Sequence, residues 1–218
     1  MNEAFLNIPV LLFSVVLHEY AHAWQARREG DNTALQLGRL TLNPIPHIDL
    51  FGSIIFPLVL LMTNAPFLFG WAKPVPVNPR NFRNYKAGDI RVSLAGIVSN
   101  LGLAVVLMVA MGLIIHLSRL MPEATPTLSL LQQMAAYGLT INLVLAFFNL
   151  LPIPPLDGSH VMYHLLPPAL GLKYRELGRY GMLLLLALMI FARPMFSVLL
   201  YPVVVLQNLA AAFISLWT

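Results

Sequence analysis

Two histidines and a glutamate lie together near the end of an apolar run, in the stretch VVLHEYAHAW. His18 and His22 are four residues apart, so on a helix they lie on the same face one turn apart, with Glu19 beside them. This HExxH spacing suits a zinc ion held by two imidazoles, with the glutamate polarising a metal-bound water. The pattern fixes only three positions, and in a soluble helix a chance match would be about as frequent as a real site.

The apolar surroundings favour a real metal site. A charged side chain deep in a bilayer costs about 2.5–3.5 kcal/mol on insertion scales. Zinc binding to small peptide sites contributes about 10–16 kcal/mol, which can offset that cost. We therefore interpret His18, Glu19 and His22 as part of a zinc site within a membrane.

A catalytic zinc site needs a third protein ligand, with a fourth position left for water. The stretch NLLPIPPLDGSH, residues 149–160, ends an apolar segment with three prolines and an Asp–Gly turn. Prolines at this density predict a rigid, extended backbone beside the membrane. Asp157 on that backbone is our candidate third ligand, although an Asp–Gly pair alone most often marks only a turn.

Other histidines have simpler interpretations. His47 and Asp49 could form a second metal site, but a turn with a helix-capping Asp is about twice as frequent. His160 and His164 are four residues apart without a neighbouring glutamate, and we assign them to an amphipathic surface helix over residues 158–166. The chain has no cysteine, which excludes disulfides and Cys-ligated metals.

The elements that position these residues are predicted to be membrane helices. The 218 residues are 58% hydrophobic and 10% charged, against about 25% charged in soluble domains. Apolar stretches of about 20 residues span 5–24, 92–117, 130–151 and 196–217, and a fifth, 175–196, is interrupted by Arg193–Pro194. We predict an all-α polytopic protein with about five transmembrane helices. Residues 1–218 would form one membrane-embedded domain, with a catalytic core over roughly 5–158 and C-terminal helices over roughly 175–217.

Two further elements are predicted between residues 24 and 92. The apolar stretch 51–69 is broken by TNAP, and its first 13 or so residues rise only about 20 Å as a helix, against a bilayer core of about 30 Å. We predict a re-entrant hairpin that turns near Asn64–Pro66, which lets His18, His22 and Asp157 face the same side. The stretch 35–44 alternates enough to predict a short strand that could pair with an extended substrate.

The basic residues favour the same topology. With the hairpin, only Arg119 and Arg193 lie on one side of the membrane, and the other side carries Arg27, Arg28, Arg39, Lys73, Arg80, Arg83, Lys86, Arg91, Lys173, Arg175 and Arg179. The positive-inside rule then places the N-terminus outside and the active site toward the cytoplasm. We expect a multi-pass protein of a prokaryotic cell membrane. The net charge of +4 follows from these loops and does not indicate nucleic-acid binding, and the sequence leaves the oligomeric state open.

Three motifs in this order resemble the site-2 proteases, which are intramembrane zinc metalloproteases. They are HEYAH at 18–22, SLAGIVSN at 93–100 and NLLPIPPLDG at 149–158, whose spacing matches the three-helix catalytic core of that family. The stretches GRLTLNPIPHID and GWAKPVPVNPRNFR are similar to the short branch that lacks a PDZ domain. The resemblance covers roughly residues 18–158.

The resemblance implies roles for individual residues. His18, His22 and Asp157 would bind one catalytic Zn²⁺, and Glu19 would act as general base and acid. Asn100 and Asn149 fall on family asparagines that lie near the substrate. The family often has proline where this chain has Ile97, so the chain departs from the pattern close to Asn100.

These inferences predict a zinc endopeptidase that cleaves within or near the transmembrane segments of other proteins, with those proteins and the lipid bilayer as its partners. The alternative is a membrane transporter of zinc or another divalent metal that uses the HExxH pair as a transport site. A transporter should carry polar ligands along several segments, whereas 92–117 offers only Ser93, Ser99, Asn100 and a terminal His116. A haem protein is less suitable, because two histidines on one helical face cannot take opposite axial positions.

Overall fold

The computed structural model describes residues 3–63, 71–191, 198 and 200–217. The helices are α1 (Glu3–Glu29), α2 (Thr33–Gln36), α3 (Phe56–Met62), α4 (Tyr85–Leu120), α5 (Thr125–Leu150), α6 (Gly158–Leu165), α7 (Pro168–Leu177), α8 (Gly181–Phe191) and α10 (Tyr201–Ser215). A π-helical turn, Leu50–Ile55, leads into α3. The all-α fold class is therefore confirmed for the described residues.

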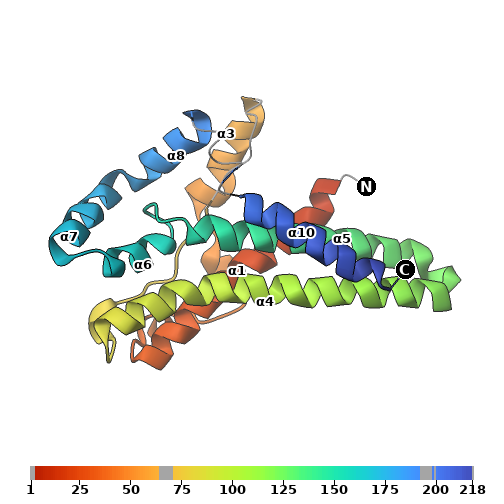
Figure 1. Cartoon of the computed structure of the whole chain (residues 1–218), viewed down its shortest axis with the longest axis horizontal. Helices are drawn as coiled ribbons and strands as arrows, with labels where there is room; N and C mark the ends of the chain where they lie inside the picture. The colour runs from red at the N-terminus through yellow and green to blue at the C-terminus, as the bar shows by residue number, and fades with distance from the viewer. Residues whose placement is uncertain (1–2, 64–70, 192–197, 199, 218) are drawn as a thin grey trace.

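Helix α4 is the longest element and organises the core. It packs along α5 and against α1, which crosses it, while α10 lies along α5 (Figure 1). Buried apolar side chains join α4, α5 and α10, among them Ala104, Leu143 and Val203. Two helical stretches, Tyr85–Leu120 and Pro122–Leu150, are long and apolar enough to cross a membrane, which is consistent with a membrane protein and matches two of the predicted spans.

The start of α4 is defined by its sequence. Asn84 precedes the helix, and its side chain accepts a hydrogen bond from the Ala87 backbone N–H at 3.0 Å. Such a cap satisfies one of the free donors in the first helical turn. The helix then continues without interruption through Ile97 to Leu120, a length of about 54 Å at 1.5 Å per residue. Helix α4 is therefore longer than the thickness of a bilayer core, and its residues before Val92 lie outside the apolar part of the helix.

The predicted strand over residues 35–44 is wrong, because no strand occurs among the described residues. The Asp31 carboxylate accepts a hydrogen bond from the Thr33 N–H at 3.1 Å, and the helical turn α2 follows from Thr33. The apolar positions do not share a buried face, since Leu35 and Leu37 are both exposed. Gly38 then takes a φ of +66°, which ends any extended run.

Trp71 contacts the beginning of the segment that starts at Leu50. The Trp71 N–H donates to the Gly52 carbonyl at 3.1 Å, and the Ser53 hydroxyl donates to the Trp71 carbonyl at 2.9 Å. The rings of Phe56 and Trp71 are 5.4 Å apart. The predicted turn near Asn64–Pro66 lies outside the described residues.

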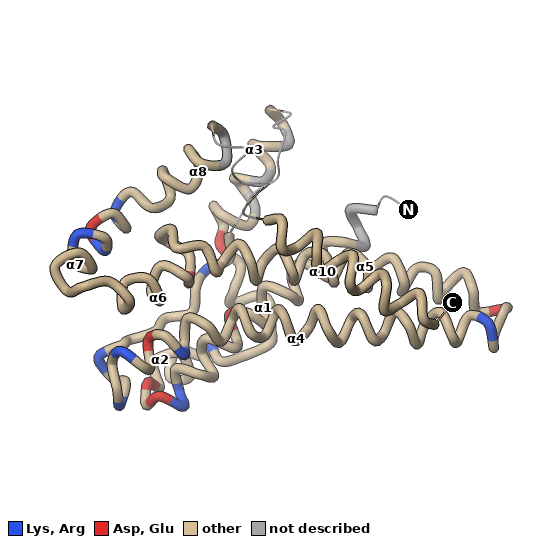
Figure 2. Tube along the Cα trace, viewed as in Figure 1, with Lys and Arg blue, Asp and Glu red and all other residues tan. Residues whose placement is uncertain are grey.

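Charged residues gather at one end of the molecule. Figure 2 shows Lys and Arg concentrated around α2, the N-terminal end of α4 and α7. The opposite end is formed by the turn between α4 and α5, which carries Arg119 and Glu123. The two ends of α4 therefore differ in charge, as expected for a helix that crosses a membrane in a fixed orientation.

Candidate metal centre

His18, His22 and Asp157 come together between α1 and the loop that follows α5. The two Nε2 atoms are 3.0 Å apart, and one Asp157 carboxylate oxygen lies 3.1 Å from His18 Nε2 and 3.3 Å from His22 Nε2. Ligand atoms around a tetrahedral zinc with bonds of about 2.0–2.1 Å are about 3.3 Å apart. Two imidazole nitrogens and a carboxylate oxygen are also ligands that zinc accepts. Among the described residues, this is the one group of three or more such side chains that could hold a metal ion.

The other nitrogen of each imidazole has its own acceptor. His18 Nδ1 donates to the Asn100 side-chain oxygen at 2.5 Å, and His22 Nδ1 donates to the Val92 carbonyl at 2.7 Å. A proton on Nδ1 leaves the lone pair on Nε2, where a metal needs it. Both acceptors come from α4, so the packing of α4 on α1 sets the tautomer and orientation of both histidines.

Asn100 belongs to a buried polar chain. Its amide donates to the Asn142 side-chain oxygen at 2.7 Å, and the Asn142 amide donates to the Ser14 hydroxyl at 2.8 Å. Asn100, Asn142 and Ser14 have no solvent exposure. Asn142 was missed by sequence reasoning, and the signal for it was an amide in the middle of an apolar run on α5.

A glycine allows α4 to approach the site. A Cβ added at Gly96 would lie 2.5 Å from His18 Cε1 and 2.6 Å from the Nε2 atoms of His18 and His22. Any side chain at this position would therefore occupy the space of the two imidazoles. Gly96 is the glycine of the SLAGIVSN motif, and the close approach to the imidazoles explains why this position has no room for a side chain.

The loop that carries Asp157 is not the extended backbone that its prolines predicted. Hydrogen bonds from the Ile153 N–H to the Leu151 carbonyl, at 2.8 Å, and from the Leu156 N–H to the Ile153 carbonyl, at 2.9 Å, fold it into successive turns. At Gly158 a Cβ would lie 2.7 Å from the Leu151 carbonyl oxygen. The close backbone packing that this glycine permits holds the loop against the end of α5.

Glu19 is held by the segment that follows Trp71. Its carboxylate accepts a hydrogen bond from the Val75 N–H at 2.7 Å, and Val75 is buried against Ala23 and Ala34. The Arg39 guanidinium donates to the Lys73 carbonyl at 2.9 Å and to the Pro74 carbonyl at 3.3 Å. Asn149, in contrast, is half-buried, and its amide donates to the Leu145 carbonyl of its own helix.

Asp89 contacts both histidines of α6. His164 Nε2 donates to Asp89 at 2.7 Å, and His160 Nδ1 lies 3.3 Å from the same carboxylate. Burial opposes ionisation of Asp89, but the two histidines outweigh it and hold the pKa of that carboxyl below its usual range. The hydrogen bond to Asp89 raises the pKa of His160. The helix over 158–166 is thus confirmed as α6, while Asp89 lies buried in α4.

His47 and Asp49 do not form a second metal site. The Asp49 carboxylate accepts a hydrogen bond from the Gly52 N–H at 2.6 Å, so the helix-capping interpretation is confirmed. His47 is buried, and its Nε2 donates to the Thr41 carbonyl at 3.0 Å. The capped turn fixes the start of the segment that returns at Trp71.

A pair of buried carboxylates ties the end of α1 to its neighbours. Glu29 accepts two hydrogen bonds of 2.8 Å from Arg91, and this bidentate contact lowers the pKa of Glu29. Asp31 accepts hydrogen bonds from the Asn78 N–H and the Asn81 amide, both at 2.7 Å. These contacts fix α1 against α4 and against the segment that holds Glu19.

A helical core with an HExxH helix and a distant carboxylate defines a metalloprotease, and the comparisons with known proteins agree. The profile of Peptidase family M50 matches residues 108–192. "Putative zinc metalloprotease YwhC" of Bacillus subtilis is 42% identical over 199 residues, which cover 88% of this chain and 82% of that protein. "Putative zinc metalloprotease Rip2" of Mycobacterium tuberculosis is 33% identical over 147 residues, covering 67% and 52%. No solved structure is significantly similar to the chain.

The chain belongs to peptidase family M50, the site-2 protease family. It is a zinc metalloprotease, so zinc is the cofactor for which the His18, His22 and Asp157 group fits. The predicted family and enzyme class are confirmed. The alternative of a metal transporter has no support among these relatives.

Proposed function

We propose that this protein is an intramembrane endopeptidase that cleaves peptide bonds within or near the transmembrane segments of other membrane proteins. The convergence of His18, His22 and Asp157 between helices of an apolar core carries the proposal. A soluble peptidase would have no need to place these polar groups among helices of this hydropathy. The substrates are therefore transmembrane proteins, and the bilayer is the medium in which they meet the enzyme.

The residues divide the chemistry between them. His18, His22 and Asp157 are the proposed zinc ligands, and Glu19 is the general base and acid. When bound, zinc supplies a Lewis acid that lowers the pKa of water and polarises a carbonyl. The Glu19 carboxylate takes the proton of the attacking water and passes it to the leaving amine. The Val75 N–H orients that carboxylate and leaves its second oxygen available for the proton.

Asn100 acts through His18 in this proposal. The side chain is fully buried and faces the imidazole, so it positions a zinc ligand where the family resemblance implied a residue near the substrate. Asn149 keeps the role of substrate contact, since it is only half-buried beside the loop of Asp157. A substrate helix must unwind locally before attack, because its carbonyls are all bonded within the helix. The second N–H of the Asn149 amide, beside the one that bonds Leu145, can bond to the released backbone.

The proposed topology places the active site toward the cytoplasm. The contact between Gly52 and Trp71 supports a re-entrant hairpin, because a spanning helix would separate these residues by the thickness of the membrane. The N-terminus is then outside. Counting 1.5 Å per helical residue from Arg27, His22 and His18 lie about 7 and 14 Å inside the cytoplasmic boundary.

Replacing Glu19 with Gln separates metal binding from chemistry. The variant should keep one zinc per chain and lose proteolysis of a transmembrane substrate, because the glutamate is the base and is not a ligand. His18→Ala and Asp157→Ala should lose both zinc and activity, and His160→Ala should keep both. Zinc content by metal analysis and cleavage by gel assay distinguish these results, and a fully active Glu19→Gln enzyme would end the proposal.

Single cysteines test the topology in this cysteine-free chain. Cysteines that replace Arg28 and Lys73 should both resist an impermeant thiol reagent applied outside intact cells, because both residues face the cytoplasm. A cysteine that replaces Glu123 should react and serves as the positive control. Labelling at position 28 with protection at position 73 would contradict both the hairpin and the proposed zinc site.

A further inference from the structure

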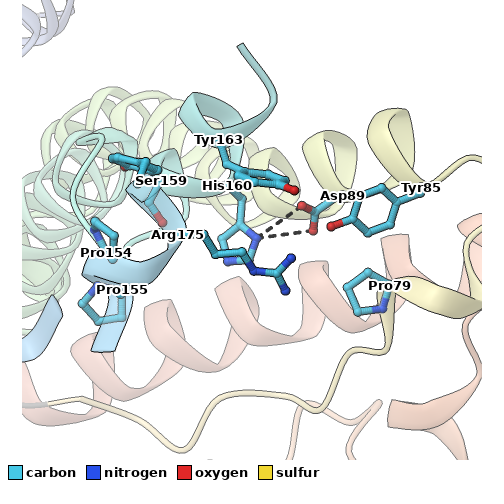
Figure 3. Close-up of a pocket in the computed structure, with 11 residues that line it drawn as sticks. Pro79, Tyr85, Asp89, Pro154, Pro155, Ser159, His160, Tyr163 and Arg175 are labelled. Atoms are coloured by element: carbon cyan, nitrogen blue, oxygen red, sulfur yellow. Dashed lines mark hydrogen bonds and ion pairs between the residues drawn. The ribbon is translucent and has the colours of Figure 1, made fainter. Parts of the chain in front are cut away.

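A second pocket lies beside the metal centre, between α4, α6 and α7. Its volume is about 260 Å³, and its polar lining includes Tyr85, Asp89, Tyr163, Tyr174 and Arg175. Figure 3 shows side chains from α4, α6 and α7 converging on this space. Pro154 and Pro155 form part of its wall, so the pocket adjoins the loop that ends at Asp157 without containing any of the proposed zinc ligands.

The pocket offers hydrogen-bond donors and a positive charge. The Arg175 guanidinium carbon lies 5.6 Å from the centre of the Tyr163 ring, and the guanidinium forms no ion pair with any carboxylate of the described residues. The buried Tyr174 hydroxyl has no hydrogen-bond partner in this part of the chain. Such a hydroxyl is destabilising unless a ligand or water completes its bonding.

Asp89 is the one carboxylate that lines the pocket among the described residues, and its oxygens already have partners. Both of its oxygens contact histidines, with His164 at 2.7 Å and His160 at 3.3 Å. The available polar groups are therefore the Arg175 guanidinium and the Tyr174 hydroxyl. An arginine with hydroxyl donors is a combination suited to a phosphate.

The position of the pocket along α4 matches the headgroup layer. The apolar part of α4 begins at Val92, and Asp89 and Tyr85 precede it by about 5 and 10 Å at 1.5 Å per residue. The headgroup region adds about 5–7 Å on each side of the hydrocarbon core. Tyrosine is also enriched at this level of membrane proteins. The pocket also lies at the charged end of the molecule (Figure 2). Lys173 and Arg179 are on either side of Arg175 in the sequence.

We infer that this pocket binds the phosphate of an anionic phospholipid headgroup, with Arg175 as the charged partner and the Tyr174 hydroxyl as a further donor. Basic pockets between helices on the cytoplasmic side of membrane proteins take such headgroups. A bound headgroup would contact Pro154 and Pro155, and through them the loop that ends at Asp157. The inference rests on the membrane placement proposed above, and its test does not depend on peptidase activity.

Lipid retention by the purified, zinc-loaded full chain tests the inference. Native mass spectrometry with increasing phosphatidylglycerol gives an apparent Kd, and phosphatidylcholine is the comparison lipid. Arg175→Gln should weaken phosphatidylglycerol binding about tenfold, as expected for loss of a hydrogen bond to a charged group. Lys173→Gln removes the same charge from the same helix outside the pocket, so it is the matched control and should change binding much less.

A second pair of variants preserves the charge. Tyr174→Phe removes only the unpaired hydroxyl and should weaken binding about threefold, whereas Tyr180→Phe, on an exposed residue outside the pocket, should have no effect. Circular dichroism and zinc content show whether Arg175→Gln folds. If it does not fold, Tyr174→Phe still tests the inference.

Three results would overturn the inference. Equal losses for Arg175→Gln and Lys173→Gln would mean that only surface charge attracts the lipid. Equal affinity for phosphatidylglycerol and phosphatidylcholine would remove the anionic headgroup as the ligand. Displacement of bound lipid by millimolar inorganic phosphate, with tighter binding of the free ion, would assign the pocket to soluble phosphate.

Discussion

Replacing Gly96 with Ala should disrupt zinc binding through a single methyl group. The added Cβ would lie 2.5–2.6 Å from atoms of both imidazoles, against 3.4 Å or more for ordinary contacts. Removing the overlap needs a movement of about 0.8–0.9 Å, the difference between these distances. The movement must come from α4 or from the histidines, because both imidazoles are buried and hydrogen-bonded to α4.

Zinc does not accommodate a movement of that size. Metal–ligand distances vary by only about 0.2 Å in well-formed sites, so the overlap exceeds the tolerance about fourfold. Changes that misorient metal ligands typically reduce metal affinity about 10- to 100-fold. We expect this loss for Gly96→Ala, and we expect peptidase activity to fall with zinc occupancy when zinc is limiting and to recover partly when zinc is in excess.

The measurement is a competition titration of the purified protein against a zinc-binding dye, followed by a cleavage assay at two zinc concentrations. Gly102→Ala is the matched control, since it lies on the same helix and a Cβ there meets no atom within 4 Å. Gly102→Ala should keep wild-type zinc affinity and gain about 0.4–1 kcal/mol of stability. Wild-type affinity and activity for Gly96→Ala would refute the arrangement of α4 against His18 and His22.

Two further predictions concern residues that act through others. Asn100→Ala should reduce zinc affinity about 10- to 100-fold, because His18 loses the acceptor for its Nδ1 proton. Asn149→Ala is the control and should leave zinc affinity unchanged. Intact zinc affinity with a raised KM for Asn100→Ala would instead assign Asn100 to substrate binding. Arg39→Ala should lower kcat about tenfold at unchanged zinc content, since the segment that orients Glu19 loses its anchor. Arg39→Lys should restore part of that loss, and a parallel fall in zinc content would show that Arg39 serves metal retention instead.

Local sequence alone predicted the pair of metal-binding histidines on α1. The spacing of His18 and His22 places them on one helical face whatever the rest of the chain does, because the helical period is a property of the backbone. The long apolar runs likewise predicted α4 and α5, since only helices satisfy the backbone in a membrane. Asp157 was suggested by its proline-rich context and by family resemblance, and the structure places its carboxylate next to both histidines.

Tertiary structure decided the contacts that join distant parts of the chain. The acceptor for His18 comes from Asn100, 82 residues away, and the link from Asn100 to Asn142 spans a further 42 residues. No local period encodes such distances, so the partners of Asn142 and the hydrogen bonds of His160 and His164 to Asp89 could not be read from the sequence. The stretch 35–44 shows the same limit. Its alternation predicted a strand, whereas the hydrogen bond from Thr33 to Asp31, the backbone of Gly38 and the exposure of Leu35 and Leu37 favoured a turn. Side-chain alternation stabilises a strand only where a partner strand and a buried face exist, and both are supplied by the fold and not by the segment itself.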